Sequence, residues 1–304
     1  MKRKIIQIAG STQLVSLPRK WALKHNIQKG DEIDVLEDGD KIIVQVDAKH
    51  EVKKKLLEVK KVDNLLNRML SALYKAGYEE IELRFNESVP TEDISENLKK
   101  HTPGFEIMDQ TNNLLLIKSI SEEQISEFDT SLRRVFLITI TMAKNILESL
   151  KDPKTNNPNT CLTLEETNNR FTNFCERLLN KKGYNNTKDS NMIYTIVWEL
   201  EKVADELKYI AQYMEEQKMK DPFSKGTISD FEKTMEVINS FYEVFYRYDE
   251  ELINKINSLR KEIIQSCNES YKTKKGPELK IIHHITNITQ MIYNITGCYM
   301  VLKN

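Results

Sequence analysis

The 304-residue sequence contains little glycine, proline or cysteine, with 9 Gly, 7 Pro and 4 Cys. Such low glycine and proline contents exclude collagen-like and most low-complexity chains, and they disfavour a fold of many short strands. The four cysteines are widely spaced without a CxxC pair, so the sequence indicates neither a zinc knuckle nor a disulfide framework. There is no run of about 18 apolar residues, and the apolar stretch near residue 5 is too short for a signal peptide. We therefore expect a cytoplasmic protein that does not insert into a membrane.

The sequence also lacks the motifs of the common enzyme classes. It has no GxSxG, no HExxH, no Walker-type glycine loop and no dinucleotide fingerprint, and it contains only five histidines. We therefore expect no enzymatic activity. The charges balance, with 45 Lys+Arg against 46 Asp+Glu, so any electrostatic partner must bind a local patch. The length leaves room for two or three compact units.

Residues 1–48 have a short, strand-like pattern. The runs IIQIA, QLVSLP, IDVLE and KIIVQV predict four strands, with a short helix near residues 21–25. The Asp38-Gly39-Asp40 turn suits a tight hairpin, because its glycine adopts positive φ easily. A segment this small buries too little apolar surface to be stable alone, so we predict that it forms a homodimer.

The charges within this segment are segregated. Seven Lys or Arg residues and no acid precede Asp31, after which acidic residues dominate. Two copies of the basic part would double a cationic surface able to replace the counterions of phosphates. We predict that DNA binds to five of these residues: Arg3, Lys4, Arg19, Lys20 and Lys24. The alternative is a segment that only dimerises and whose lysines are solvated.

Two ordered motifs in this segment carry a family resemblance. They are Ser16-Leu17-Pro18-Arg19-Lys20-Trp21, at the entry to the short helix, and Ile27-Gln28-Lys29-Gly30-Asp31-Glu32-Ile33, before the last hairpin. With this spacing the segment resembles the AbrB/SpoVT family of swapped-hairpin barrels. That resemblance implies an interlaced homodimer that often binds DNA.

Residues 49–120 mix helical and strand patterns and predict a small α/β linker domain. Apolar residues at spacings of three and four predict a helix over residues 51–76, ended by Gly77. A strand, EIELRF, a helix over residues 93–101 and two strands, FEIMD and NLLLIKS, follow. The lysines between residues 53 and 61 either extend a nucleic-acid surface or form the solvated face of the first helix.

Residues 121–304 predict six long helices. An apolar seam recurs every seven residues in three of them, as in Leu200, Val203, Leu207 and Ile210, which indicates antiparallel helical bundles. A shift of 85 residues places this seam on that of the last helix. We therefore predict two three-helix repeats, at about 121–219 and 227–304, and a multidomain fold class: swapped-hairpin β-barrel, small α/β middle domain and all-α body.

The third of these helices carries a carboxylate pair. Glu201 and Asp205 are four residues apart, so they share one helix face, beside the apolar seam. They could hold a cation, because hard metals bind oxygen ligands, or they could belong to an ordinary charged face. The surrounding string, WELEKVADELKYIAQ, resembles the pattern of PhoU, a phosphate-uptake regulator built from two three-helix bundles.

The PhoU resemblance covers about residues 121–304 and adds three expectations. PhoU proteins carry multinuclear metal clusters, often iron, so it implies a divalent or ferric metal at Glu201 and Asp205; the shifted positions hold Thr286 and Gln290, which are not charged ligands. Together the two resemblances imply an archaeal type of DNA-binding transcriptional regulator of phosphate uptake and homeostasis, whose helices act as a sensor. The alternative is an adaptor that does not bind DNA and negatively regulates a phosphate transporter or its sensor. The partners of such an adaptor would be the subunits of that transporter or sensor.

Overall fold

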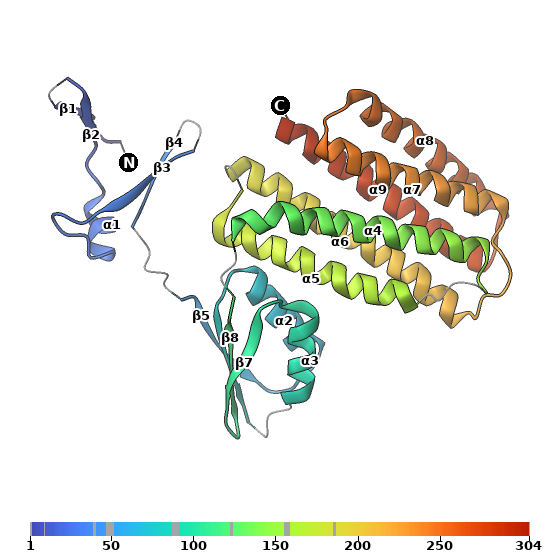
Figure 1. Ribbon diagram of the computed structural model, residues 1–304, viewed down its shortest axis with the longest axis horizontal. Helices are drawn as coiled ribbons and strands as arrows, with labels where there is room; N and C mark the ends of the chain where they lie inside the picture. Colours follow the sequence, from blue (N-terminus) through green and yellow to red (C-terminus); the bar gives the residue numbers. More distant parts are fainter. Residues whose placement is uncertain are drawn as a thin grey trace. The chain divides into compact units, whose positions relative to one another are not determined.

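The computed structural model describes residues 2–8, 10–38, 41–46, 52–86, 91–121, 124–154, 159–184 and 187–303 (Figure 1). These residues form two compact units, Met1–Glu51 and Val52–Asn304. The first unit is small and β-rich, and the second consists mostly of helices. This layout confirms a multidomain chain with a β-rich N-terminal region and a largely helical body.

The N-terminal unit contains two separate antiparallel hairpins. Strand β1 (Ile6–Ile8) pairs with β2 (Thr12–Leu14), and β3 (Ile33–Asp38) pairs with β4 (Lys41–Val46). A short helix, α1 (Arg19–Lys24), lies between them and begins after Pro18. The four strands and the helix were predicted. Of the predicted hairpin turn, Gly39 and Asp40 lie outside the described residues, and the register pairs Asp38 with Lys41.

The second unit begins with a four-stranded sheet covered on one face by two helices. Its strands are β5 (Lys54–Val59), β6 (Glu80–Phe85), β7 (Phe105–Gln110) and β8 (Leu114–Ser119), in the order β5-β6-β8-β7. Strand β5 runs parallel to β6, and the other pairs are antiparallel. Helices α2 (Asn64–Lys75) and α3 (Thr91–His101) lie on one face (Figure 1). On the opposite face, Glu80 forms ion pairs with Lys54 and Lys118.

The helix predicted over residues 51–76 is wrong in its first half. Residues 54–59 form β5, in which Leu57 and Val59 are buried and their neighbours are exposed, a period of two. The helix begins only at Asn64, because the Asp63 side chain accepts hydrogen bonds from the backbone N–H groups of Leu65 and Leu66. Lysines 54 and 55 therefore lie on a strand and not on the solvated face of a helix.

Among the described residues, six long helices follow the sheet layer, as predicted. They are α4 (Phe128–Lys151), α5 (Asn159–Lys182), α6 (Thr187–Glu216), α7 (Lys225–Tyr246), α8 (Glu250–Thr273) and α9 (Pro277–Lys303). Helices α4, α5 and α6 pack together, as do α7, α8 and α9, and α6 packs along α9 between the two groups. Asp249 caps the start of α8 through the N–H groups of Glu251 and Leu252. This cap marks a helix boundary that glycine and proline do not reveal.

The predicted apolar seams form the core of the helices. Leu200, Val203 and Leu207 of α6 are fully buried, and so are Ile285 and Ile288 of α9 at positions shifted by 85 residues. The sheet and its two helices have a separate core, which includes Leu70, Ile81 and Leu115. The domain boundary predicted near residue 120 remains a prediction, since both cores lie in one compact unit. None of the helices that the structure describes has the length and apolar character that crossing a membrane requires.

Candidate functional site

The five residues predicted to bind DNA are all exposed on the N-terminal unit. Arg3 and Lys4 precede β1, whereas Arg19, Lys20 and Lys24 belong to α1. Lys20 and Lys24 are four residues apart and therefore share one face of this helix. Basic side chains held on a short exposed helix and on the arm before a strand can reach phosphate oxygens.

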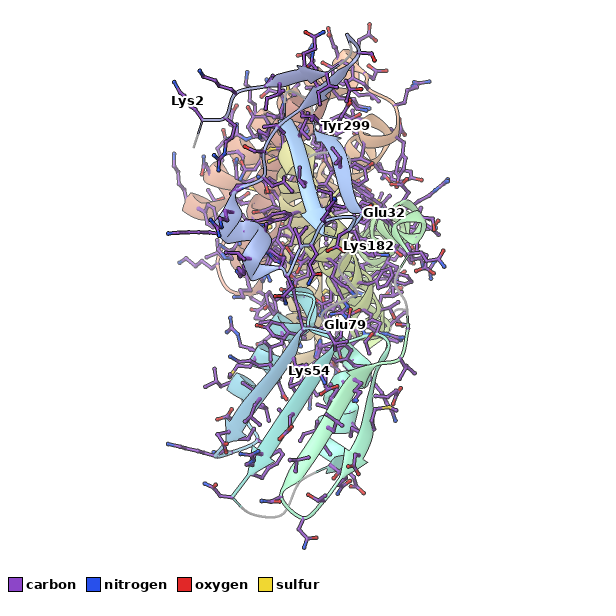
Figure 2. The ribbon with its side chains drawn as sticks, turned by 90° about the vertical axis from the view of Figure 1, so that its left-hand side faces the viewer. Lys2, Glu32, Lys54, Glu79, Lys182 and Tyr299 are labelled. Carbon is purple, nitrogen blue, oxygen red and sulfur yellow. The ribbon has the colours of Figure 1, made fainter. Side chains whose placement is uncertain are left out.

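The turn before β3 separates the basic beginning of the unit from its acidic part along the chain. Lys2 and Glu32 project from well-separated places in Figure 2. The carboxylate of Asp31 accepts a hydrogen bond of 2.6 Å from the backbone N–H of Gln28, which closes the turn around Gly30. At this glycine φ is +98°, a conformation that other residues rarely adopt.

The described residues of the N-terminal unit form no buried core. Among the side chains described between Lys2 and Val44, none is buried. Apolar side chains that would normally form a core are exposed instead, up to 69% for Ile42. They comprise Ile5, Ile6, Ile8, Leu14, Val15, Leu23, Val35, Ile42 and Ile43. So much exposed apolar surface on two open hairpins is typical of a segment that packs against a partner.

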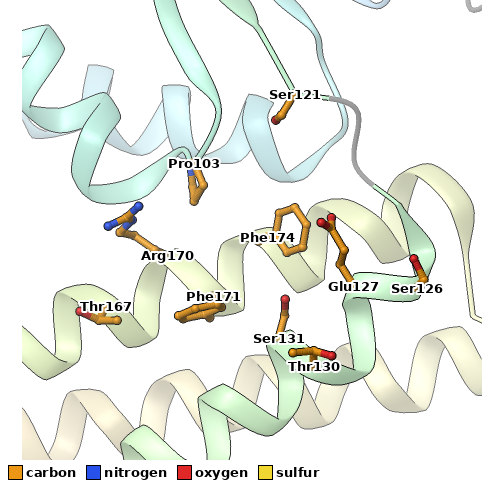
Figure 3. A pocket seen from close by; sticks show the side chains of 10 residues that line it. All are labelled: Pro103, Ser121, Ser126, Glu127, Thr130, Ser131, Thr167, Arg170, Phe171 and Phe174. Atoms are coloured by element: carbon orange, nitrogen blue, oxygen red, sulfur yellow. The ribbon is translucent and has the colours of Figure 1, made fainter.

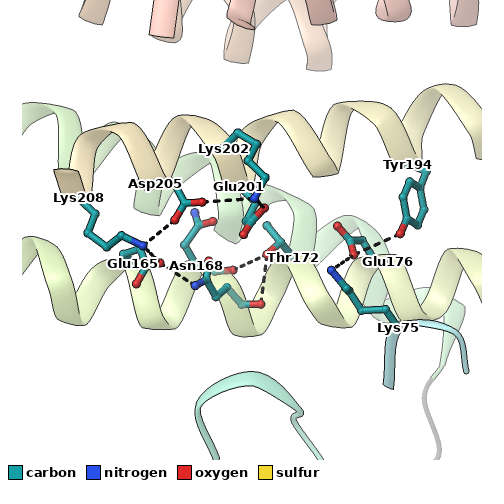
Figure 4. Close-up of polar contacts among 11 residues, drawn as sticks. Lys75, Glu165, Asn168, Thr172, Glu176, Tyr194, Glu201, Lys202, Asp205 and Lys208 are labelled. Carbon is teal, nitrogen blue, oxygen red and sulfur yellow. Dashed lines mark hydrogen bonds and ion pairs between the residues drawn. The ribbon is translucent and has the colours of Figure 1, made fainter. Parts of the chain in front are cut away.

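Glu201 and Asp205 lie side by side on α6, as predicted, but lysines already neutralise them (Figure 4). The ammonium of Lys202 lies 2.7 Å from Glu201 and 3.3 Å from Asp205. The other oxygen of Asp205 accepts from Lys208, at 2.7 Å, and Lys208 also donates to Glu165 of α5, at 2.7 Å. Burial works against the charged ammonium, but these hydrogen bonds outweigh it, so the pKa of Lys208 is raised.

This arrangement does not fit a metal ion. Two ammonium groups contact three of the four carboxylate oxygens that would be its ligands, and a cation there would face their repulsion. Among the described residues, no group of three or more His, Cys, Asp and Glu side chains is placed to hold a metal. In the second three-helix group, Gln290 takes the place of Asp205 and accepts hydrogen bonds of 3.0 and 2.8 Å from Arg260. In each of the two three-helix groups, a cationic side chain therefore binds to this position of the motif.

The sequence does not predict a buried polar cluster around Glu176 of α5. The carboxylate of Glu176 is 1% exposed and pairs with Lys75 of α2, at 3.1 Å, while Tyr194 of α6 donates to it at 3.4 Å (Figure 4). Burial raises the pKa of Glu176, against the opposing effect of Lys75. Lys75 also lies over the ring of Trp198, 4.9 Å from its centre. These contacts tie the α/β layer to the helices.

The comparison with known protein families concerns only the beginning of the chain. Residues 6–55 match the family described as "Antidote-toxin recognition MazE, bacterial antitoxin". The match runs from β1 to the start of β5. It supports an N-terminal domain of the MazE/AbrB type, which agrees in part with the predicted AbrB/SpoVT resemblance. No match supports the PhoU resemblance of the helices. No curated protein and no solved structure matches the chain.

Proposed function

We propose that this protein is a homodimeric DNA-binding regulator. Two copies of the N-terminal unit form one barrel, and this barrel presents the basic residues of both copies to DNA. The observation that carries the proposal is the exposure of these nine apolar side chains on a unit that matches a MazE-type family. A second copy would bury these side chains and also pair the open strand edges.

The charge of the unit supports DNA as the partner. Arg19, Lys20 and Lys24 are exposed and, within the described part of the chain, have no ion pair or hydrogen bond through their side chains. Cations that make no internal contact can bind phosphates without first losing a partner. Together with Arg3 and Lys4, they would give a dimer ten cations for the DNA backbone, two for each residue named.

Fluorescence anisotropy with labelled duplexes, selected from fragmented genomic DNA, tests this function. We expect the affinity to fall with salt, with a log–log slope of about 0.9 per phosphate contact. The variant Arg19→Gln with Lys20→Gln should weaken binding at least about tenfold and reduce the slope. Its matched control is Arg68→Gln with Lys144→Gln, two exposed cations of α2 and α4. No retention of DNA at low salt, or equal effects of both double variants, would overturn the proposal.

The regulated process is a finer proposal. The resemblance of Trp198–Gln212 to the PhoU pattern leads us to propose phosphate uptake, with the helices as sensor or partner-binding module. Enrichment of DNA upstream of transporter genes among the selected fragments would support it. The adaptor alternative, in which the helices bind transporter or sensor subunits, predicts co-purification of those subunits that Arg19→Gln with Lys20→Gln leaves unchanged.

The family match favours one further candidate function. The matched family is described as an antitoxin, so the protein could act as the antidote to a toxin that it binds and neutralises. In that case, co-expression with the product of the adjacent gene should yield a stable complex and relieve growth inhibition by that product. Normal growth when the product is expressed alone would eliminate this candidate.

A further inference from the structure

A cavity of about 560 Å³ lies between the α/β layer and helices α4 and α5 (Figure 3). Its walls come from the turn after α3, the end of β8, the 3₁₀ turn Ile125–Glu127 and the facing sides of α4 and α5. The lining residues are Pro103, Ser121, Ser126, Glu127, Thr130, Ser131, Thr167, Arg170, Phe171 and Phe174. A volume of this size is typical of sites for small organic molecules.

The middle of the cavity is apolar and aromatic. Phe171 and Phe174 project from α5 into the space bounded by Pro103 on one side and Ser131 on the other (Figure 3). Both rings are only half-buried, although they pack against the core of the helices. Exposed aromatic faces of this kind suit a flat apolar group, which gains contact area there and removes apolar surface from water.

Among the described residues that line the cavity, Arg170 is the cationic one, and its side chain is available for a ligand. The guanidinium of Arg170 is exposed and makes no hydrogen bond, ion pair or ring contact with another described residue. The acidic residue of the lining, Glu127, is engaged in a capping box, where its carboxylate accepts from the backbone N–H of Gln124. A guanidinium offers several N–H donors in a planar fork, which suits a carboxylate or phosphate.

The wall formed by the α/β layer is firmly placed. Gly104 follows Pro103 with φ of +80°, and a Cβ at this position would collide with the hydroxyl of Ser121. The amide of Asn173 on α5 donates a hydrogen bond of 2.8 Å to the carbonyl oxygen of His101, at the end of α3. A ligand would therefore not have to order this wall on binding.

We propose that this cavity binds a small planar organic anion. Its anionic group pairs with the guanidinium of Arg170, and its flat apolar part packs against Phe171 and Phe174. The hydroxyls of Ser126 and Thr130 donate hydrogen bonds to its remaining oxygens. Because the walls belong to both the α/β layer and the helices, an occupant strengthens the packing between them. This inference does not depend on DNA binding.

The test uses the full-length protein and two probes that differ mainly in charge. These are 2-naphthoate and its uncharged counterpart 2-naphthalenemethanol, with binding followed by isothermal titration calorimetry and saturation-transfer NMR. The wild type should bind naphthoate saturably. Arg170→Gln should weaken naphthoate binding at least about tenfold and leave the alcohol unaffected. Thr130→Trp, which places an indole in the cavity, should prevent binding of both probes.

The matched control is Arg68→Gln, which removes an exposed arginine of α2 that does not line the cavity. It should leave both affinities unchanged. Absence of saturable naphthoate binding up to about 5 mM would overturn the proposal, since weaker association carries less than roughly 3 kcal/mol. Equal affinities of wild type and Arg170→Gln for naphthoate would overturn it as well. If Thr130→Trp fails to fold, the Arg170→Gln comparison remains decisive.

Discussion

Arg177 of α5 is completely buried, and its guanidinium donates a hydrogen bond of 2.7 Å to the carbonyl oxygen of Tyr74, near the end of α2. It donates a second one, of 2.6 Å, to the carbonyl oxygen of Tyr78. The guanidinium also lies 4.7 Å from the centre of the Tyr74 ring. Since the last carbonyls of a helix lack partners within it, Arg177 caps α2 from a helix of the other layer. This contact fixes the α/β layer on the helical body.

Replacing this arginine should destabilise the protein strongly. Arg177→Met keeps an apolar stem but leaves two carbonyl oxygens without these donors, and we expect the free energy of unfolding to fall by about 3 kcal/mol. Urea denaturation followed by circular dichroism measures the change. The control is Arg170→Met on the same helix, whose exposed side chain should contribute less than about 0.5 kcal/mol. Similar effects of both variants would contradict the capping role.

We expect that one charge introduced into the exposed apolar surface of the N-terminal unit weakens dimerisation. The side chain of Ile42 is 69% exposed in the single chain, and we expect it to be buried in a dimer. Ile42→Asp replaces it with a carboxylate. Burying an unpaired charge is unfavourable, so the dimer dissociation constant should rise at least about tenfold. Light scattering during size-exclusion chromatography reports the mass. Leu65→Asp on α2, where the leucine is 65% exposed, should leave the mass unchanged.

The elements that the sequence predicts well are those with a strong local pattern. The strands of the N-terminal unit are short apolar runs bounded by turns, and the helical seams of α6 and α9 keep one period for about six turns. The pattern misleads at residues 51–63, where Leu56, Val59 and Val62 are spaced as in a helix. The outcome there depends on β6, which pairs with β5 in parallel from 26 residues further along the chain. The periodicity of one segment gives no information about the strand with which it pairs.

In the candidate sites too, the sequence predicts the local features but not the contacts between helices. The sequence predicts that Glu201 and Asp205 share a face, because helix geometry alone fixes that. It does not predict Glu165, whose carboxylate approaches Lys208 from α5, because the pairing of helices decides which polar groups meet. A signal was present nevertheless: Glu165, Asn168, Thr172 and Glu176 recur at spacings of three and four, and all four are buried. Helical periodicity of polar residues therefore marks a buried face as apolar periodicity does.

We expect the lysines around the carboxylate pair to prevent it from binding cations. Lys208→Met removes the ammonium shared by Asp205 and Glu165, and we expect a loss of about 2 kcal/mol in the free energy of unfolding. The vacated space is bordered by carboxylates, so excess Mn²⁺ should raise the melting temperature of this variant. It should not raise that of the wild type. A wild-type protein stabilised by Mn²⁺, with the effect lost in Glu201→Ala with Asp205→Ala, would instead restore the metal site predicted from the sequence.

We expect the contact between α6 and α9 to make the free energy of unfolding depend on pH. The imidazole of His284 donates to the carboxylate of Glu206, and the amide of Asn287 lies 3.3 Å from both carboxylate oxygens. Burial alone would raise the pKa of Glu206, but the hydrogen bonds from His284 and Asn287 and the coulombic effect of the neighbouring imidazoles outweigh it, so the pKa is lowered. Folding therefore favours the ionised carboxylate at the junction of the two three-helix groups.

Glu206→Gln should remove this dependence. Because the pKa of Glu206 is lower in the folded than in the unfolded chain, its contribution is fully present above the unfolded pKa, near 4.5, and is lost as pH falls through the folded value. We expect the wild type to exceed Glu206→Gln by about 2 kcal/mol at pH 6 and by progressively less below pH 4.5. Urea denaturation across this range measures the difference, with Glu216→Gln, exposed at the end of α6, as the control. A difference that stays constant as the pH falls would show that Glu206 acts through its shape and not its charge.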